Sequence, residues 1–224
     1  MLRLLHFSDT HGNFPRLYGR FDAVIHTGDW LGNSPAIFSG NRTQEAVFQM
    51  RQVEDNLENI KRQAQGRPYL FILGNHDFVH PQMVEQFLCS EGVQAIDLTD
   101  KVVSFQGINF YGYPYIPYIH GNWNYERQVP EMQEQIKPLV ETLNQTYIDV
   151  LVCHAPIHGT LDLTVGNDVI GSTVIAQALD YQIAKEMQPA YYLHGHCHEA
   201  NGIAMRNGML VSNMATTQTI LEIG

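Results

Sequence analysis

The chain repeats one pattern five times: a short apolar run ends and a cluster of polar residues follows directly. Such runs are typical of buried β-strands, and helix-like stretches separate several of them, which predicts an α/β fold. In open α/β sheets, ligands bind beyond the carboxyl ends of the strands, so we expect the polar clusters to meet at one end of the fold. The five runs are Leu2 to Phe7, Ala23 to His26, Pro68 to Leu73, Tyr147 to Cys153 and Tyr191 to Leu193.

Four helices and two hairpins are expected along the rest of the chain. Apolar residues from Thr43 to Gln65 step by four and three positions, which predicts a helix that ends at Gly66 and buries Ala46, Met50, Val53, Leu57, Ile60 and Ala64. A second helix begins at Pro81. Met132 to Leu143 is predicted to be helical, with Pro138 either kinking it or lying near a helix start. Ser172 to Gln188 is a further expected helix, and Gln106-Gly107 and Asn207-Gly208 mark hairpin turns.

Composition limits the classes of function. A chain of 224 residues fits one domain over residues 1–224, and no stretch approaches the roughly 20 apolar residues of a membrane helix. The formal charge of −10 argues against a stable complex with nucleic acid or an anionic membrane, and favours a small ligand. Three widely spaced cysteines form no disulfide framework, and a removable leader would discard Asp9 and His11, so we expect a cytoplasmic protein.

The polar clusters contain seven oxygen or nitrogen donors and no thiolate, a set that suits two divalent metal ions sharing one carboxylate. His196 and His198 are two residues apart, so in an extended segment their rings face one side about 7 Å apart, which suits one ligand on each ion. The alternative is that these residues are turn and cap residues with satisfied hydrogen bonds. The donors are Asp9, His11, Asp29, Asn75, His154, His196 and His198.

Five ordered blocks resemble the signature of the calcineurin-like metallophosphoesterases. They are Asp9-x-His11, Gly28-Asp29, Gly74-Asn75-His76-Asp77, His154 and Gly195-His196-x-His198. The resemblance implies a four-layer α/β/β/α sandwich of two mixed β-sheets flanked by helices, with a binuclear metal centre. It also implies Asp9, His11, Asp29 and His198 on one ion, and Asp29, Asn75, His154 and His196 on the other. The donor types fit Mn, Fe, Zn and Co alike.

The segment from Phe110 to Tyr118 and the block Gly195 to Glu199 resemble the MPPED-type branch of this family. That resemblance implies a phosphodiesterase that acts on cyclic nucleotides. The expected mechanism is in-line attack of a metal-bridging hydroxide, with His76 as the general acid. We expect Asp77 to fix the tautomer of His76, as the resemblance also implies; the alternative is a structural pair beside the metals.

The charge of the centre bears on the substrate. Two divalent ions, two ligand carboxylates and one hydroxide leave a single positive charge, which a monoanionic phosphodiester balances. The Ser/Thr protein phosphatases of this family carry an Arg shortly after the Gly-Asp pair, whereas Trp, Leu, Gly and Asn occupy positions 30–33 here. Arg16, Arg42 or Arg127 could still reach the site from loops. A phosphomonoesterase or protein phosphatase, a nuclease and a non-catalytic scaffold remain alternatives.

Seven aromatic residues lie between positions 110 and 125, a density typical of a nucleobase platform, of apolar core or of a subunit contact. The oligomeric state is left open. His6, His26 and His194 are expected to be buried and hydrogen-bonded, and Cys153 and Cys197 to pack in the core. The predicted substrate contacts are Trp30, Asn33, Tyr113, Tyr115 and His158.

Overall fold

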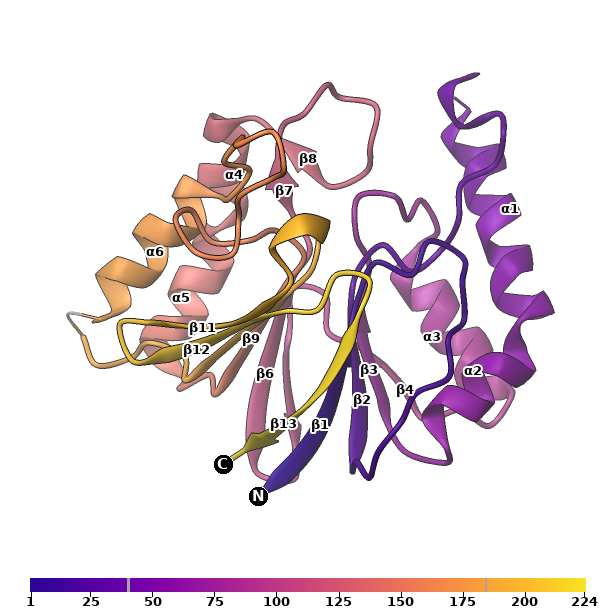
Figure 1. Cartoon of the computed structure of the whole chain (residues 1–224), viewed down its shortest axis with the longest axis horizontal. Helices are drawn as coiled ribbons and strands as arrows, with labels where there is room; N and C mark the ends of the chain where they lie inside the picture. The colour runs from indigo at the N-terminus through magenta and orange to yellow at the C-terminus, as the bar shows by residue number, and fades with distance from the viewer. Residues whose placement is uncertain (40, 184) are drawn as a thin grey trace.

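The computed structural model describes residues 1–39, 41–183 and 185–224, and contains two large β-sheets packed face to face (Figure 1). In the first sheet β1, β2, β3 and β4 are parallel and β13 is antiparallel to β1. Its order is β13 (Gln218–Ile223), β1 (Leu2–Phe7), β2 (Ala23–Thr27), β3 (Tyr69–Ile72) and β4 (Ala95–Asp97).

In the second sheet β12, β10, β9 and β6 are parallel, and the two edge strands are antiparallel to their neighbours. Its order is β11 (Gly202–Arg206), β12 (Met209–Asn213), β10 (Tyr191–His194), β9 (Val150–Cys153), β6 (Ile108–Tyr113) and β5 (Val102–Phe105). A small parallel pair, β7 (Ile116–Pro117) and β8 (Glu126–Arg127), lies apart from both sheets.

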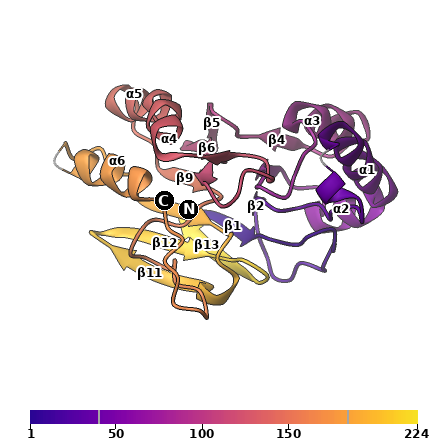
Figure 2. The ribbon, with the colours of Figure 1, turned by 90° about the horizontal axis from the view of Figure 1, so that it is seen from above.

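Helices cover the outer face of each sheet, as the view from above shows (Figure 2). The first sheet carries α1 (Arg42–Asp55), α2 (Leu57–Ala64) and α3 (Pro81–Ser90). The second carries α4 (Val129–Gln135), α5 (Lys137–Gln145) and α6 (Thr173–Ile183). A third apolar cluster, which includes Leu4, Ile25, Phe110 and Val152, fills the space between the sheets. The predicted four-layer α/β/β/α sandwich is confirmed.

The long helix expected over residues 43–65 divides at Asn56 into α1 and α2. The buried side chains of α1 are Glu45, Gln49 and Val53, whereas Ala46 and Met50 are only half-buried, so the predicted apolar stripe is wrong by one position over this stretch. The prediction counted apolar residues alone, and two of the residues that α1 buries are polar. Pro138 stands in the first turn of α5, one of its two predicted positions.

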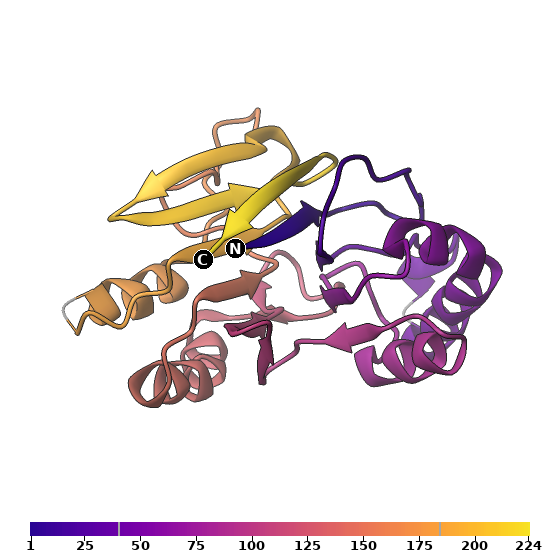
Figure 3. The same ribbon diagram turned by 90° about the horizontal axis from the view of Figure 1, so that it is seen from below.

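The parallel strands place the polar clusters at one end of the molecule. β1, β2 and β3 of the first sheet and β9 and β10 of the second all run toward the same edge, opposite the chain ends (Figure 1). The two termini lie side by side in the view from below because β13 pairs with β1, with Leu2 opposite Ile223 (Figure 3). Among the described residues, no helix combines the length and apolar character needed to cross a membrane.

Candidate metal centre

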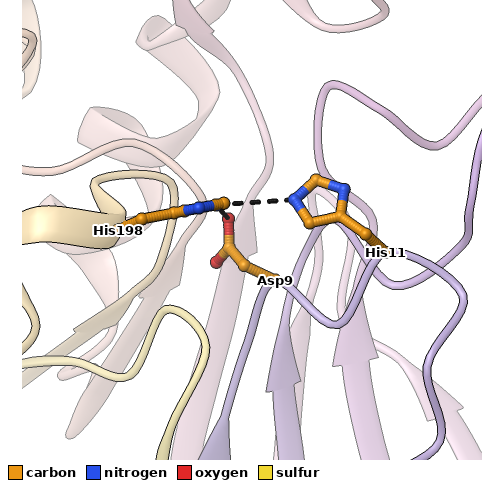
Figure 4. Close-up of side chains that lie close together, drawn as sticks. All are labelled: Asp9, His11 and His198. Atoms are coloured by element: carbon orange, nitrogen blue, oxygen red, sulfur yellow. Dashed lines mark hydrogen bonds and ion pairs between the residues drawn. The ribbon is translucent and has the colours of Figure 1, made fainter.

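One group of donor atoms joins Asp9 and His11, which follow β1, with His198, which follows β10. One ligand atom from each residue lies within 4.8 Å of the other two (Figure 4). The Nε2 atom of His198 is 3.2 Å from Oδ1 of Asp9 and 3.4 Å from Nε2 of His11. Two imidazole nitrogens and a carboxylate oxygen therefore converge on one point.

A second group lies beside the first and joins Asp29, His154 and His196 within the same 4.8 Å limit. The Nε2 atom of His154 is 3.3 Å from Oδ2 of Asp29 and 3.0 Å from Oδ1 of Asn75. The other ring nitrogen of His154, Nδ1, is 2.8 Å from the carbonyl oxygen of Thr27. The N–H group at Nδ1 donates to this carbonyl oxygen, so Nε2 is the ring nitrogen that can bind a cation once it has lost its proton.

The chemistry of the donor set fits divalent metal ions. Two imidazole nitrogens that face each other at 3.4 Å, as in His11 and His198, repel unless a proton or a cation lies between them. Nitrogen and oxygen donors at these spacings are typical of first-row transition metals. All seven predicted ligands lie in this region. Each of the two groups contains members of one predicted ligand set. The Oδ2 atom of Asp29, the predicted shared ligand, also lies 3.9 Å from Nε2 of His11 in the first group. The occupancy by two ions stays a prediction.

The backbone at the donors is strained. Asp9, His11, Asp29 and His196 have φ angles of 55°, 44°, 52° and 68°, a region that residues other than glycine rarely adopt. Each such residue costs on the order of 1 kcal/mol and persists only where the surrounding structure enforces it. Strain at four donor residues is typical of a functional site.

The buried residues Asp29 and His154 shift each other's pKa in opposite directions. Burial alone would raise the pKa of Asp29, but the adjacent imidazoles, chiefly that of His154, hold it well below its usual range. Burial alone would lower the pKa of His154, but the charge of Asp29 raises it to about 9. A cation at this position must therefore displace a proton from His154, so we expect metal affinity to increase with pH.

His76 has a different ring partner from the one predicted. Its Nδ1 atom lies 2.6 Å from Oδ1 of Asn33. Asp77 is fully buried, and its carboxylate accepts backbone N–H groups from Trp30, Leu31 and Gly74 at 3.1, 2.8 and 2.8 Å. The prediction that Asp77 fixes the tautomer of His76 is therefore wrong, because its carboxylate oxygens are occupied in holding two loops together. Burial, and then the charge of Asp29, raise the pKa of Asp77 to about 7.

Both donor groups open into a cavity of about 610 Å³ that His76 also lines. Trp123 covers the ring of His76, with ring centroids 3.9 Å apart and planes inclined by 31°. The remaining lining is mostly apolar and includes the hydroxyl side chain of Thr164 and one carboxylate. Besides the donors, it includes Pro117, Tyr118, Ile119, Thr164, Val169, Ile170 and Glu199.

Comparison with known proteins identifies the fold and its family. The sequence matches the family model for calcineurin-like phosphoesterases over residues 2–200. The chain belongs to the calcineurin-like phosphoesterase family. Solved structures agree in fold: one aligns with a TM-score of 0.64 and 14% identity over 99% of both chains. Another, from Thermus thermophilus, aligns with a TM-score of 0.57 and 12% identity over 96% of this chain and 89% of its own.

Curated relatives are distant. A UPF0046 protein of Caenorhabditis elegans is 25% identical over 228 residues, which cover 96% of this chain and 69% of the worm protein. Human metallophosphoesterase domain-containing protein 1 is 25% identical over 224 residues, which cover 90% of this chain. The alignment spans 62% of the human protein, less than two thirds of its length.

Two glycines of the phosphoesterase motif are required by close packing of the donors. A Cβ atom on Gly74 would collide with the backbone nitrogen and Oδ1 of Asp29. A Cβ atom on Gly195 would collide with Oδ2 of Asp9 and the hydroxyl of Ser8. Both positions therefore accept only glycine without displacing a carboxylate donor.

The aromatic residues predicted to contact substrate lie in the core of this phosphoesterase instead. Trp30 is completely buried and stacks on Tyr69 with centroids 5.2 Å apart. Tyr113 is also fully buried, and Tyr115 packs against it and donates from its hydroxyl to Asp100. The predictions for Trp30, Tyr113 and Tyr115 are wrong, because these rings point away from the cavity into apolar layers.

The other two predicted substrate contacts differ from each other. His158 is half-exposed near Asp162 and is not among the described residues that line the cavity, so its contact with substrate stays a prediction. Asn33 does reach the site, but through the ring of His76. The aromatic segment 110–125 contributes Tyr118 and Trp123 to the cavity instead, and Glu199 directly follows the donor His198. The density of aromatic residues in the sequence pointed to this segment. It did not distinguish the side chains that pack in the core from those that line the cavity.

Proposed function

We propose that this phosphoesterase is a binuclear-metal-dependent phosphodiesterase that acts on a small diester such as a cyclic nucleotide. The observation that carries the proposal is the charge of the cavity. Among the described residues that line it, none is Lys or Arg, and the only carboxylate besides Asp29 is Glu199. A dianionic monoester normally requires a cationic clamp beside the metals, whereas a monoanionic diester does not.

None of the three arginines that could have supplied such a clamp lines this cavity. Arg42 donates to the carbonyl oxygen of Gly121 at 3.1 Å and lies over the ring of Phe78. Arg127 lies over the ring of Tyr115, and Arg16 lines a different cavity. This arrangement favours a substrate with one negative charge at the reacting phosphorus.

In the proposed reaction the metal ligands act on the side of the attacking oxygen, and His76 acts on the side of the leaving oxygen. Bound divalent cations supply the Lewis acidity that ionises water near neutral pH and offsets charge on the phosphoryl oxygens. In the reaction, an oxygen derived from water forms a bond to phosphorus and the bond from phosphorus to the leaving oxygen breaks. The leaving oxygen retains that electron pair and takes a proton from Nε2 of His76, whose Nδ1 is occupied by Asn33.

Aromatic side chains at the cavity support a nucleotide substrate. Trp123 and Tyr118 line its wall, and each can stack against a base, an interaction worth about 1–3 kcal/mol. The apolar Ile119, Val169 and Ile170 extend the same surface. These contacts suit a substrate with one charged phosphodiester and one flat, weakly polar group.

Hydrolysis of matched substrates tests the proposal. Protein reconstituted with Mn²⁺ or Zn²⁺ is assayed with bis(p-nitrophenyl) phosphate, p-nitrophenyl phosphate and 2′,3′- and 3′,5′-cyclic nucleotides, with His196→Ala as the inactive control. We expect the diester to react faster than the monoester and at least one cyclic nucleotide to be opened. Faster hydrolysis of the monoester would indicate a phosphatase instead, and no hydrolysis with metal bound would indicate a scaffold.

A further inference from the structure

The side chain of Asn33 bridges the ring of His76 and a buried carboxylate on α1. Its Nδ2 atom donates to the carbonyl oxygen of His76 at 2.9 Å and to Oε1 of Glu45 at 3.1 Å. A carbonyl oxygen can only accept, so the amide nitrogen must face it. The amide oxygen then faces Nδ1 of His76 at 2.6 Å, and because this oxygen can only accept, Nδ1 must carry a proton.

Glu45 holds the amide in this orientation. Its side chain is 2% exposed, and the Oε1 atom also accepts the backbone N–H of Ser34 at 2.8 Å. The hydroxyl of Ser34 donates to its other oxygen, Oε2. One turn further along α1, Gln49 donates to the same His76 carbonyl oxygen at 2.7 Å. The helix α1 thus fixes the loop that carries His76 through two buried polar side chains.

We propose that Asn33, supported by Glu45, is the positioning residue of His76: it keeps the proton of the neutral ring on Nδ1 and presents Nε2 to the leaving group. The inference rests on the proposed function for its catalytic consequence. Asn33 does not touch the reacting atoms, so it acts through His76.

The contact serves the ring before and after proton transfer. The charged ring carries protons on both nitrogens and donates from Nδ1 to Asn33. After Nε2 passes its proton to the leaving oxygen, the neutral ring still holds the Nδ1 proton and keeps the same hydrogen bond. Free histidine has no such constraint on its tautomer, so loss of Asn33 leaves a population of rings with the wrong nitrogen protonated or turned away from the substrate.

The kinetic test compares leaving groups. The variant Asn33→Leu keeps the size of the side chain and removes both hydrogen-bonding groups. A nucleoside alkoxide needs protonation to leave, whereas p-nitrophenolate does not, so we expect kcat to fall about 10- to 100-fold for a cyclic nucleotide and much less for bis(p-nitrophenyl) phosphate. Metal content should not change. An equal loss for both substrates, or no loss, would contradict the positioning role.

Three further variants separate positioning from loosening of the loop. Gln52→Leu removes two hydrogen bonds to Gly32 in the same loop without touching His76, so it should not change the ratio of rates between the two substrates. Asn33→Asp retains an acceptor for Nδ1 but places a carboxylate against Glu45. Adding Glu45→Gln restores a donor at that position, so the double variant should recover part of the loss. No recovery would contradict the support by Glu45.

A measurement without turnover keeps the inference independent of the proposed function. In metal-free protein with ¹⁵N-labelled histidine, at a pH where the ring is neutral, we expect the imidazole spectrum to show His76 protonated on Nδ1, with assignment by loss of the signal in His76→Asn. Asn33→Leu should shift the ring toward the Nε2-protonated form. An Nε2-protonated ring in the unsubstituted protein would overturn the inference, whereas absent hydrolysis with the expected tautomer would overturn only the proposed function.

Discussion

The Nε2 atom of His154 lies 3.3 Å from the Oδ2 atom of Asp29, and the two residues come from different sheets. Asp29 follows β2 of the first sheet, His154 follows β9 of the second, and both side chains are almost completely buried. The group around Asp9 likewise joins a residue after β1 to His198 after β10. Each of these two donor groups takes residues from both sheets, so the site depends on the packing of one sheet against the other.

Removal of one imidazole should remove one metal ion. His196→Ala deletes a donor from the group with Asp29 and His154, while Asp9, His11 and His198 remain in place. We expect elemental analysis to show about two ions per chain in the unsubstituted protein and about one in the variant. His158→Ala, at a half-exposed histidine outside the cavity lining, is the matched control and should keep both. Unchanged metal content in His196→Ala would show that this residue is no ligand.

Asp77→Ala should destabilise the protein. Without the carboxylate, the backbone N–H groups of Trp30, Leu31 and Gly74 lose their acceptor in a buried region. Each unsatisfied group costs roughly 1–3 kcal/mol, so we expect the free energy of unfolding to fall by on the order of 3 kcal/mol after relaxation. Urea unfolding of the metal-free protein measures this change. A variant with an unchanged unfolding midpoint would contradict the structural role of Asp77.

Acid should destabilise the metal-free protein below pH ~6.5. Burial lowers the pKa of His6 well below its ordinary value, that of His26 to about 3 and that of His194 to about 4. As the pH falls through about 6.5, these side chains take up protons in the unfolded chain but not in the folded one, so stability is lost at up to about 1.4 kcal/mol per pH unit for each. Above that pH the raised pKa of His154 acts in the opposite direction, and below it this ring is charged in both states. Between pH ~7 and pH ~4 the raised pKa of Asp77 also opposes the loss and offsets about one histidine, whereas the lowered pKa of His196 adds to the loss.

Urea midpoints measured from pH ~7 to pH ~4.5 test this dependence. His6→Gln should reduce the slope because it removes one of the histidines that stay neutral in the folded protein. His120→Gln, at an exposed position, should leave the slope as it is. Stability that stays constant or increases on acidification would contradict the assignment of these three histidines as neutral in the folded protein.

Trp123 should contribute to the binding of a base. Its ring lies in the cavity wall beside His76. Trp123→Ala should raise the KM of a cyclic nucleotide by roughly 5- to 100-fold, since stacking on a base is worth about 1–3 kcal/mol. The KM of methyl p-nitrophenyl phosphate, which has no base, should change less. Equal changes for both substrates would argue against base stacking.

The location of the site could be predicted from the sequence because it depends on local signals. Each donor block follows an apolar run directly, and strands that run in parallel must end at the same edge. Pro81 and the turn at Asn207-Gly208 are equally local, and the structure places them in the first turn of α3 and between β11 and β12. The blocks also carry the family signature, which explains why the layers were predicted correctly.

The interactions that could not be predicted depend on contacts between distant loops. Asn33 and His76 are 43 positions apart, and nothing in either loop alone distinguishes Asn33 from Asp77 as the partner of the ring. Likewise, the periodicity of α1 marks apolar residues, whereas Glu45 and Gln49 are buried because they bind loop groups. For Trp30 and Tyr113, sequence shows an aromatic ring near the site but not the face into which it points.

Anomalous scattering from crystals grown with Mn²⁺ tests the central claim most directly. The account predicts two peaks about 3.5–4 Å apart with Asp29 between them, one near Asp9, His11 and His198 and the other near Asn75, His154 and His196. A single peak away from Asp29, or none within reach of these imidazoles in protein soaked with saturating metal, would contradict it.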